Sequence, residues 1–223
     1  MGEMRHHTPA GDVAKFYDRV PCGLLDRFII RMRAHLSSYE IIAAHVPFSG
    51  LILDVGSGFG ILAIYLALLS GKRDIRGVDI SNRRIRISRA ASRNVPNVSF
   101  EQSNFLEYNF EGYDCIILMD VLHYFPDPVQ DRFLRKCCRR VNPGGTILIR
   151  DSNREHKFRQ FFTWLHESVM TKSGFTKGDG LYFRRFGELK NIVESLGFNV
   201  KVMPMWGVTP FADTLMVAKK RRI

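Results

Sequence analysis

The sequence predicts an α/β protein whose parallel sheet is covered by helices on both faces. From about residue 51, short apolar runs alternate with amphipathic stretches of helical period. The run at 113–120 is nearly all apolar, which is typical of a strand buried on both faces. The last two strand-like runs are joined by only seven residues, WGVTPFA, too few for a crossover helix. Right-handed crossovers therefore give a doubly wound, Rossmann-like sheet that ends in an antiparallel pair.

Turn and capping residues place the elements in order. LILDV (51–55) is a strand that runs into a glycine-rich turn and an apolar helix stopped by Gly71. DIRGVDI (74–80) is the next strand, and Ser81 caps a helix over 81–94. Asp127 and Pro128, as N-cap and first helical residue, open another helix. The remaining predictions are strands at 98–102, 113–120, 146–152, 198–205 and 213–220, and a helix at 187–197.

Two segments lie outside this alternation, one before it and one after the fifth strand. In the first, the helical stretch 24–36 has one apolar stripe, with Arg27 and Arg31 off it. This composition is typical of a helix that packs on the sheet edge as a lid, which is the preferred interpretation, and also of an interfacial helix on a membrane. The stripe consists of Leu25, Phe28, Ile29, Met32 and Leu36. The second segment, which contains Trp164, is also predicted to be helical.

Composition narrows the partners and the location. The chain has 223 residues, a length that suits one domain, and a net charge of +11, which favours an anionic partner such as nucleic acid, anionic lipid or an acidic metabolite. The four cysteines form no C-x-x-C pair, so a metal site or a disulfide framework is disfavoured. Because no secretory leader or membrane-spanning run is recognisable, we expect a cytoplasmic protein, with peripheral membrane contact as an addition.

The glycine-rich turn and a carboxylate beyond it indicate a ribose-bearing cofactor. Residues 54–60 read DVGSGFG, so bare backbone is presented where a strand turns into a helix. Asp79, at the end of the next strand, is placed to accept hydrogen bonds from ribose hydroxyls. A nicotinamide dehydrogenase would carry a third fingerprint glycine where this chain has Ile61. The spacing therefore favours a cofactor without a pyrophosphate.

Five motifs follow one another along the chain: LDVGSGFG (53–60), GVDIS (77–81), SFEQSNFLEY (99–108), YDCIILMDVLHYF (113–125) and VNPGGTILIRDS (141–152). In this order they resemble the motifs of class I S-adenosylmethionine-dependent methyltransferases. The resemblance implies a seven-stranded sheet with the last strand antiparallel, and S-adenosylmethionine as the cofactor. It also implies a single domain: a helical cap (1–47), a cofactor-binding core (48–152), a helical insertion or lid (153–186), and a C-terminal helix with the antiparallel strand pair (187–223).

The same resemblance assigns cofactor contacts. The glycine loop and Asp54 would face the methionine end, Asp79 the ribose and Ile80 the adenine. Ordinary alternatives are strand-end caps for the two aspartates and a core position for Ile80, which would be buried in almost any version of this fold. The full set is Asp54, Gly56, Ser57, Gly58 and Gly60 in the loop, Asp79 and Ile80, Asn104 and Phe105 at the adenine edge, and Met119 and Asp120 beside the methyl group.

His123 is the best-placed general base for an oxygen acceptor, with Tyr124 beside it. A histidine hydrogen-bonded for structural reasons is an equal alternative. Tyr17 and Trp164 are weaker candidates for the acceptor pocket. No metal ligand is assigned.

The predicted function is therefore methyl transfer to a small-molecule or lipid-like acceptor, through an oxygen. The stretch MDVLHYF (119–125) lacks the Asn/Asp-Pro-Pro-aromatic motif of amide and exocyclic-amine methyltransferases. Two alternatives stay open: an RNA methyltransferase that uses the basic surface, and a non-catalytic cofactor-binding scaffold or regulatory protein. The basic residues in question are Arg83, Arg84, Arg86, Arg89, Arg93 and Lys219 to Arg222.

Overall fold

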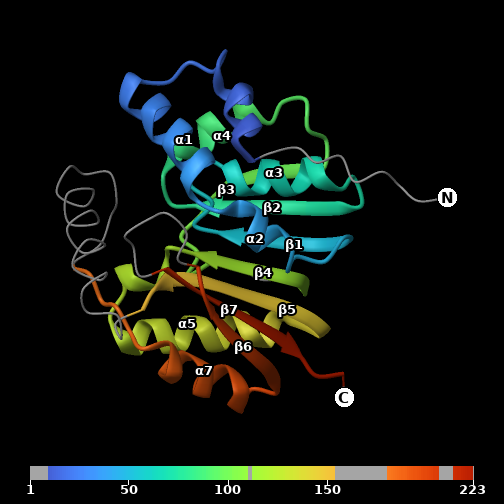
Figure 1. Ribbon diagram of the computed structural model, residues 1–223, viewed down its shortest axis with the longest axis vertical. Helices are drawn as coiled ribbons and strands as arrows, with labels where there is room; N and C mark the ends of the chain where they lie inside the picture. Colours follow the sequence, from blue (N-terminus) through green and yellow to red (C-terminus); the bar gives the residue numbers. More distant parts are fainter. Residues whose placement is uncertain (1–9, 110–111, 154–179, 206–212, 223) are drawn as a thin grey trace. The chain divides into compact units, whose positions relative to one another are not determined.

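The computed structural model describes residues 10–109, 112–153, 180–205 and 213–222 (Figure 1). Seven strands form one sheet in the order β3-β2-β1-β4-β5-β7-β6. Strand β7 pairs antiparallel with both β5 and β6. The predicted seven-stranded α/β class with an antiparallel last strand is thus confirmed. The chain divides into two compact units, residues 1–109 and 110–223. The single domain and its internal boundaries stay a prediction.

The first unit carries three parallel strands and their crossover helices. Strands β1 (Gly50–Val55), β2 (Arg73–Asp79) and β3 (Val98–Gln102) pair in parallel. Helix α3 (Ile61–Leu69) is buried from Ile61 to Ala67, which explains its nearly continuous apolar sequence. Helix α4 (Asn82–Ala91) begins at the predicted cap, where Ser81 Oγ accepts from Arg84 N at 3.4 Å. These elements place the carboxyl ends of β1 and β2 beside the starts of α3 and α4.

The N-terminal helices correct one prediction. They are η1 (Ala10–Tyr17, a 3-10 helix), α1 (Leu24–Leu36) and α2 (Tyr39–Ala43). The apolar stripe predicted for 24–36 is split: Ile29 is buried, Met32 is half-buried, and Leu25 and Phe28 are exposed. The side chain of Leu36 lies outside the described residues. The buried face consists of Asp26, Ile29, Ile30 and Ala34.

The rotation of α1 has a polar cause that the hydrophobic pattern does not contain. Asp26 is buried because its carboxylate accepts from Gly23 N at 3.2 Å and forms an ion pair with Arg83 of α4. A charge buried in this way keeps its partners close. Asp26 therefore turns the helix so that part of the apolar stripe faces solvent.

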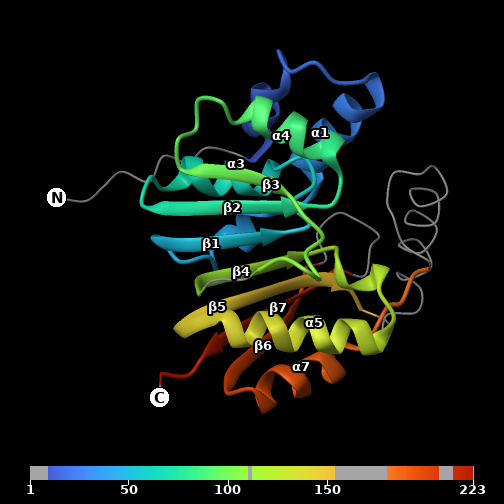
Figure 2. The same ribbon diagram turned by 180° about the vertical axis from the view of Figure 1, so that it is seen from behind.

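The second unit contains β4 (Tyr113–Met119), η2 (Leu122–Tyr124), α5 (Asp127–Arg140), β5 (Val141–Ser152), α7 (Phe186–Ser195), β6 (Phe198–Pro204) and β7 (Asp213–Lys220). Strands β4 and β5 are parallel. Helices α5 and α7 lie side by side on one face of these strands (Figures 1 and 2). The N-cap of α5 is Pro126, one residue before the predicted Asp127.

Cys137 and Cys138 of α5 are buried, and burial raises the pKa of the Cys138 thiol to about 12. The predicted helical insertion falls largely on residues 154–179, outside the described residues. In the described part of the chain, no helix is long and apolar enough to cross a membrane.

Candidate functional site

The glycine loop of the first unit has the backbone that its sequence predicts. Gly56, Gly58 and Gly60 have φ angles of 69°, 57° and 78°, in the left-handed region that favours glycine. A Cβ at Gly60 would also overlap the ring of Phe100 and the Cβ of Ser88. Gly60 is the N-cap of α3, so the loop leads from the end of β1 directly to a helix N-terminus. Such a backbone can approach a ligand closely.

Asp79 is fixed beside this loop by two backbone donors. Its Oδ2 accepts from Gly58 N at 2.9 Å, and its Oδ1 accepts from Ser81 N at 2.8 Å. Arg84 Nη1 lies 4.0 Å from Oδ2, and the Arg84 guanidinium lies over the ring of Phe59. Each carboxylate oxygen can accept more than one hydrogen bond. Asp79 therefore combines a rigid position with remaining capacity to accept from a diol.

Asp54, at the end of β1, is a buried carboxylate close to a second one. Burial, and to a lesser extent the negative charge of Asp79, raise the pKa of Asp54 to about 7. Two acidic groups of this kind favour a ligand that brings positive charge, since a cation relieves both the desolvation and the repulsion. This end of the first unit is electrostatically suited to a cationic ligand.

The other predicted site residues of the first unit differ in their exposure and hydrogen bonding. Ile80 is 44% exposed, so the expectation that it would be buried in almost any version of the fold is wrong. Phe105 is buried. Asn104 already has local partners, because its Oδ1 accepts from Leu106 N at 3.2 Å and its Nδ2 donates to Glu107 at 3.0 Å. Ser57 Oγ is buried without a hydrogen-bond partner among the described residues.

Tyr17 anchors the glycine loop to the N-terminal helices, which its sequence position did not reveal. Its hydroxyl donates to Phe59 O at 2.6 Å, and its ring is buried. Burial raises the pKa of Tyr17 well above its usual value, so the hydroxyl keeps its proton and stays a donor. The predicted role of Tyr17 in the acceptor pocket stays a prediction.

In the second unit, Asp120 follows β4 directly and has an unusual backbone conformation. Its φ of 54° lies in the left-handed region. Its backbone N–H donates to Arg150 O at 2.9 Å, and its carboxylate forms an ion pair with Arg150. Arg150 also pairs with Asp213 of β7. These contacts hold a strained backbone directly after the half-buried Met119.

His123 forms a buried pair with Asp151. The ring Nδ1 lies 2.7 Å from Asp151 Oδ1, and the His123 backbone N–H donates to Asp151 Oδ2 at 3.3 Å. Since a carboxylate accepts, Nδ1 carries the proton and Nε2 is left as the basic nitrogen. Asp151 is absent from the sequence-based set of candidates. Asp151 is the last residue but one of β5, much as Asp79 is the last residue of β2, so the same rule, a carboxylate at a strand end, could have found it.

Aromatic side chains enclose this histidine. The Phe183 ring stacks on His123 with centroids 5.2 Å apart, and the Tyr124 ring is tilted at 4.1 Å. Tyr182 N donates to His123 O at 2.7 Å, and His123 is only 3% exposed. Trp164 lies outside the described residues. The segment 180–183 thus covers the histidine from within its own unit.

Comparisons with known proteins agree with this geometry. A protein family described as a methyltransferase domain matches residues 52–145, which contain the glycine loop, Asp79 and His123. The ubiquinone biosynthesis O-methyltransferase of Aliivibrio fischeri is 27% identical over 186 residues, covering 82% of this chain and 78% of its own. The protein of the same name from Acinetobacter baumannii is 29% identical over 157 residues, covering 68% of this chain and 65% of its own.

Solved structures show the same fold. An O-methyltransferase family protein from Burkholderia thailandensis superimposes with a TM-score of 0.71 at 17% identity, covering 88% of this chain and 59% of its own. The O-methyltransferase NcsB1 from neocarzinostatin biosynthesis, solved with S-adenosylmethionine and 2-hydroxy-5-methyl naphthoic acid, gives a TM-score of 0.65 at 20% identity, covering 88% of this chain and 57% of its own.

Proposed function

The chain is a class I S-adenosylmethionine-dependent methyltransferase that acts on a small molecule, and from this premise we propose that the methyl group goes to an oxygen of a small or lipid-like acceptor. The observation that carries the proposal is the buried pair of His123 and Asp151. A base is useful for a phenol, alcohol or acid, whereas an amine acceptor needs only a neutral nucleophile. The relatives named as O-methyltransferases support the same choice of atom.

The first unit fits the cofactor on observations of its own. S-adenosylmethionine, when bound, supplies a methyl group on a positively charged sulfur. Asp54 is a buried carboxylate whose raised pKa favours a cationic partner. Asp79 is held by Gly58 and Ser81 with capacity left for two ribose hydroxyls. Ile80 offers an exposed apolar side chain beside them, which an adenine ring would cover.

The second unit supplies the proton transfer in this proposal. Asp151 holds the His123 ring with the proton on Nδ1, so that Nε2 accepts the proton of the acceptor hydroxyl as the oxygen attacks. Asp151 is then a positioning residue that also stabilises the imidazolium. The segment with Phe183 excludes water from the pair. The alternative interpretation, a structural histidine, makes turnover independent of this pair.

The RNA alternative is weakened by what the arginines of α4 do. Arg83 pairs with Asp26, Arg84 faces Asp79 and Phe59, and Arg89 donates to Phe100 O at 2.8 Å. Three of the five arginines predicted as a nucleic-acid footprint are thus engaged inside the first unit. A small or lipid-like acceptor, with peripheral contact to a membrane, stays the proposal in preference to nucleic acid.

The test is methyl transfer from labelled S-adenosylmethionine into cell extract that is separated into lipid, RNA, protein and small-molecule fractions. We expect label in the lipid or small-molecule fraction, in an alkali-stable ether or an alkali-labile ester. Label in RNA would contradict the small or lipid-like acceptor, and label on nitrogen would contradict the oxygen. A chain that binds the cofactor tightly but labels no fraction would be a scaffold.

A further inference from the structure

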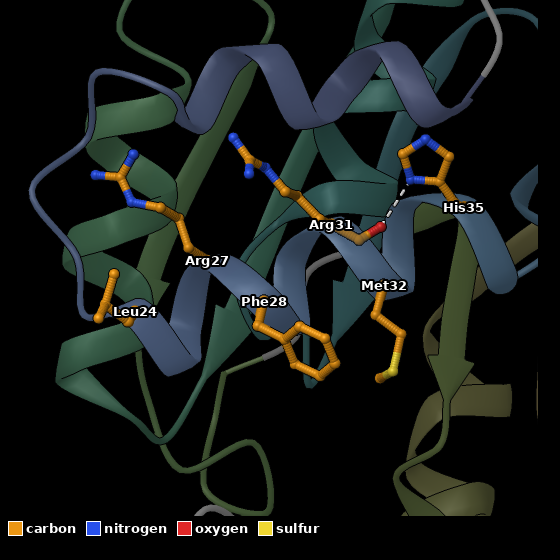
Figure 3. Close-up of a pocket in the computed structure, with 6 residues that line it drawn as sticks. All are labelled: Leu24, Arg27, Phe28, Arg31, Met32 and His35. Atoms are coloured by element: carbon orange, nitrogen blue, oxygen red, sulfur yellow. Dashed lines mark hydrogen bonds between the residues drawn. The ribbon is translucent and has the colours of Figure 1, made fainter.

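An exposed apolar patch with arginines beside it occupies one side of α1. Leu24, Leu25 and Phe28 are 88%, 58% and 65% exposed. Figure 3 shows Leu24, Phe28 and Met32 in one row along the helix, with Arg27, Arg31 and His35 in a second row beside them. We refer to Leu24, Leu25, Phe28, Arg27 and Arg31 as the α1 patch. Large apolar side chains this exposed on consecutive turns of one helix indicate an interaction surface.

The exposure of the patch is fixed by the contacts that α1 makes with the rest of the first unit. Ile29 and Ile30 are buried, and Asp26 is held by Gly23 and Arg83. Arg27 donates to Asp18 O at 3.0 Å and to Val20 O at 3.3 Å. Turning the helix to bury Phe28 would expose the isoleucines and break these bonds. The patch is therefore a stable surface of the first unit.

We propose that the α1 patch docks the protein on an anionic lipid surface. The charge argument is that residues 18–35 carry four arginines against two aspartates, of which Asp26 is buried and paired. Arg31 forms an ion pair with Asp18 at 3.2 Å, and its side chain stays 61% exposed. A helix that presents apolar side chains flanked by arginines inserts roughly 5–10 Å into the headgroup region, where anionic lipids attract its basic residues.

A second copy of the chain fits the patch less well. A two-fold interface would bring Arg27 and Arg31 of both copies into one small contact area, which repulsion between like charges opposes. A stable dimer also buries roughly 800 Å² on each partner, whereas an aromatic side chain contributes about 150–250 Å². Leu24, Leu25 and Phe28 alone do not reach that area. Charge and size both favour a bilayer.

The patch is connected to the cofactor end of the first unit. Arg83, the partner of Asp26, lies in the first turn of α4, four residues after Asp79. Tyr17, on η1 before the patch, holds Phe59 of the glycine loop. A docked α1 would therefore keep this loop near the bilayer, where a lipid-like acceptor is found. This last step rests on the proposed function, but docking itself does not.

Vesicle flotation tests the proposal with the full chain. Phosphatidylcholine vesicles with increasing phosphatidylglycerol are the probe, at low and high salt. We expect binding that rises with phosphatidylglycerol and falls with salt. The double variant Leu24→Ser/Phe28→Ser should bind on the order of 10–100-fold more weakly. The matched control is Ile41→Ser/Phe48→Ser, which removes two other exposed apolar side chains (41% and 51% exposed) and should bind as the wild type does.

A second pair of variants tests the charge. Arg31→Gln should weaken binding roughly fivefold, while Arg139→Gln, an exposed arginine of α5 with the same effect on net charge, should not. Thermal unfolding confirms that each variant is folded. Failure of the wild type to float, or equal loss in both members of a pair, would overturn the proposal. Sedimentation showing a dimer that only Leu24→Ser/Phe28→Ser dissociates would assign the patch to a second copy. If the wild type does not float but still transfers methyl groups, the docking proposal is rejected and the proposed function stands.

Discussion

The cofactor end of the first unit and the His123–Asp151 pair of the second unit are held by different kinds of contact. Asp79 is held by the backbone N–H groups of Gly58, in the glycine loop, and of Ser81. His123 is held by a side chain 28 residues away and covered by a ring 60 residues away. A glycine loop that holds a carboxylate through its backbone has a fixed spacing in the sequence, whereas a long-range pair of side chains has none. The two regions therefore differ in how far sequence alone can specify them.

The largest expected effect tests whether His123, held by Asp151, works as a general base. His123→Ala should keep cofactor affinity and lose roughly 10²–10⁴-fold in turnover, because proton removal then depends on water. His45→Ala, which changes a half-buried histidine of the first unit, is the control and should leave turnover unchanged. The measurement is kcat with labelled cofactor across neutral pH.

Asp151→Asn sharpens the same test. The amide cannot hold the Nδ1 proton as a carboxylate does, so turnover should fall and its pH profile should shift. A merely structural pair would lose stability and leave the pH profile of the remaining activity unchanged. That second result would reassign His123 to packing and point to an acceptor that needs no base.

The next effect tests the proposed contact between Asp79 and the cofactor in the first unit. Asp79→Ala removes the acceptor of the ribose hydroxyls and should weaken cofactor binding by about 1.5–3 kcal/mol, or roughly 10–150-fold. Asp74→Ala on the same strand is the control, because Asp74 is exposed. Titration calorimetry measures both. Equal affinity in wild type and Asp79→Ala would disprove the assignment of Asp79 to the ribose.

A smaller effect concerns the pH dependence of cofactor binding. The pKa of Asp54 is raised to about 7 in the ligand-free protein, so this carboxyl group ionises as the pH rises through 7. A cationic ligand gains from that ionisation, and affinity should rise by up to roughly tenfold per pH unit between pH 6 and 7. Asp54→Asn should remove this slope. A slope that survives the substitution would come from another group.

The same raised pKa has an opposite consequence for stability. The folded state holds the Asp54 proton more tightly than the unfolded state, so this group stabilises the fold fully only below its unfolded pKa. Its contribution is lost as the pH rises from about 4 to 7. Ligand-free protein should therefore lose thermal stability over this range, and Asp54→Asn should lose less. Calorimetry at constant ionic strength measures the difference.

What sequence could predict follows the same division. Alternating apolar runs, the glycine loop and Asp79 depend on local spacing, and the strands that they predicted are present within one or two residues, except that β5 begins at Val141, five residues before its predicted start. The rotation of α1 was predicted wrongly, because a buried ion pair between Asp26 and Arg83 overrides the apolar stripe. The pairing of Asp151 with His123, 28 residues away, has no local signal, although the rule of a carboxylate at a strand end could have found Asp151 itself. Ile80 was expected to be buried because strand ends usually are, but it is exposed.

The smallest expected effect concerns the hydrogen bond from Tyr17 of η1 to the glycine loop. Tyr17→Phe removes one buried hydrogen bond to Phe59 O and leaves that carbonyl without this donor, at a cost of about 0.5–1.5 kcal/mol. For a chain of this length, such a change lowers the melting temperature by roughly 2–4 °C per kcal/mol. Because Phe59 belongs to the glycine loop, cofactor affinity should fall several-fold as well. Tyr182→Phe, which changes a half-buried tyrosine of the other unit, is the control for the loss of a hydroxyl. If Tyr17→Phe lowers the melting temperature but leaves cofactor affinity at the wild-type value, the hydroxyl supports only the fold of the N-terminal helices. The glycine loop would then hold its shape through its own backbone, as Asp79 does, without help from η1.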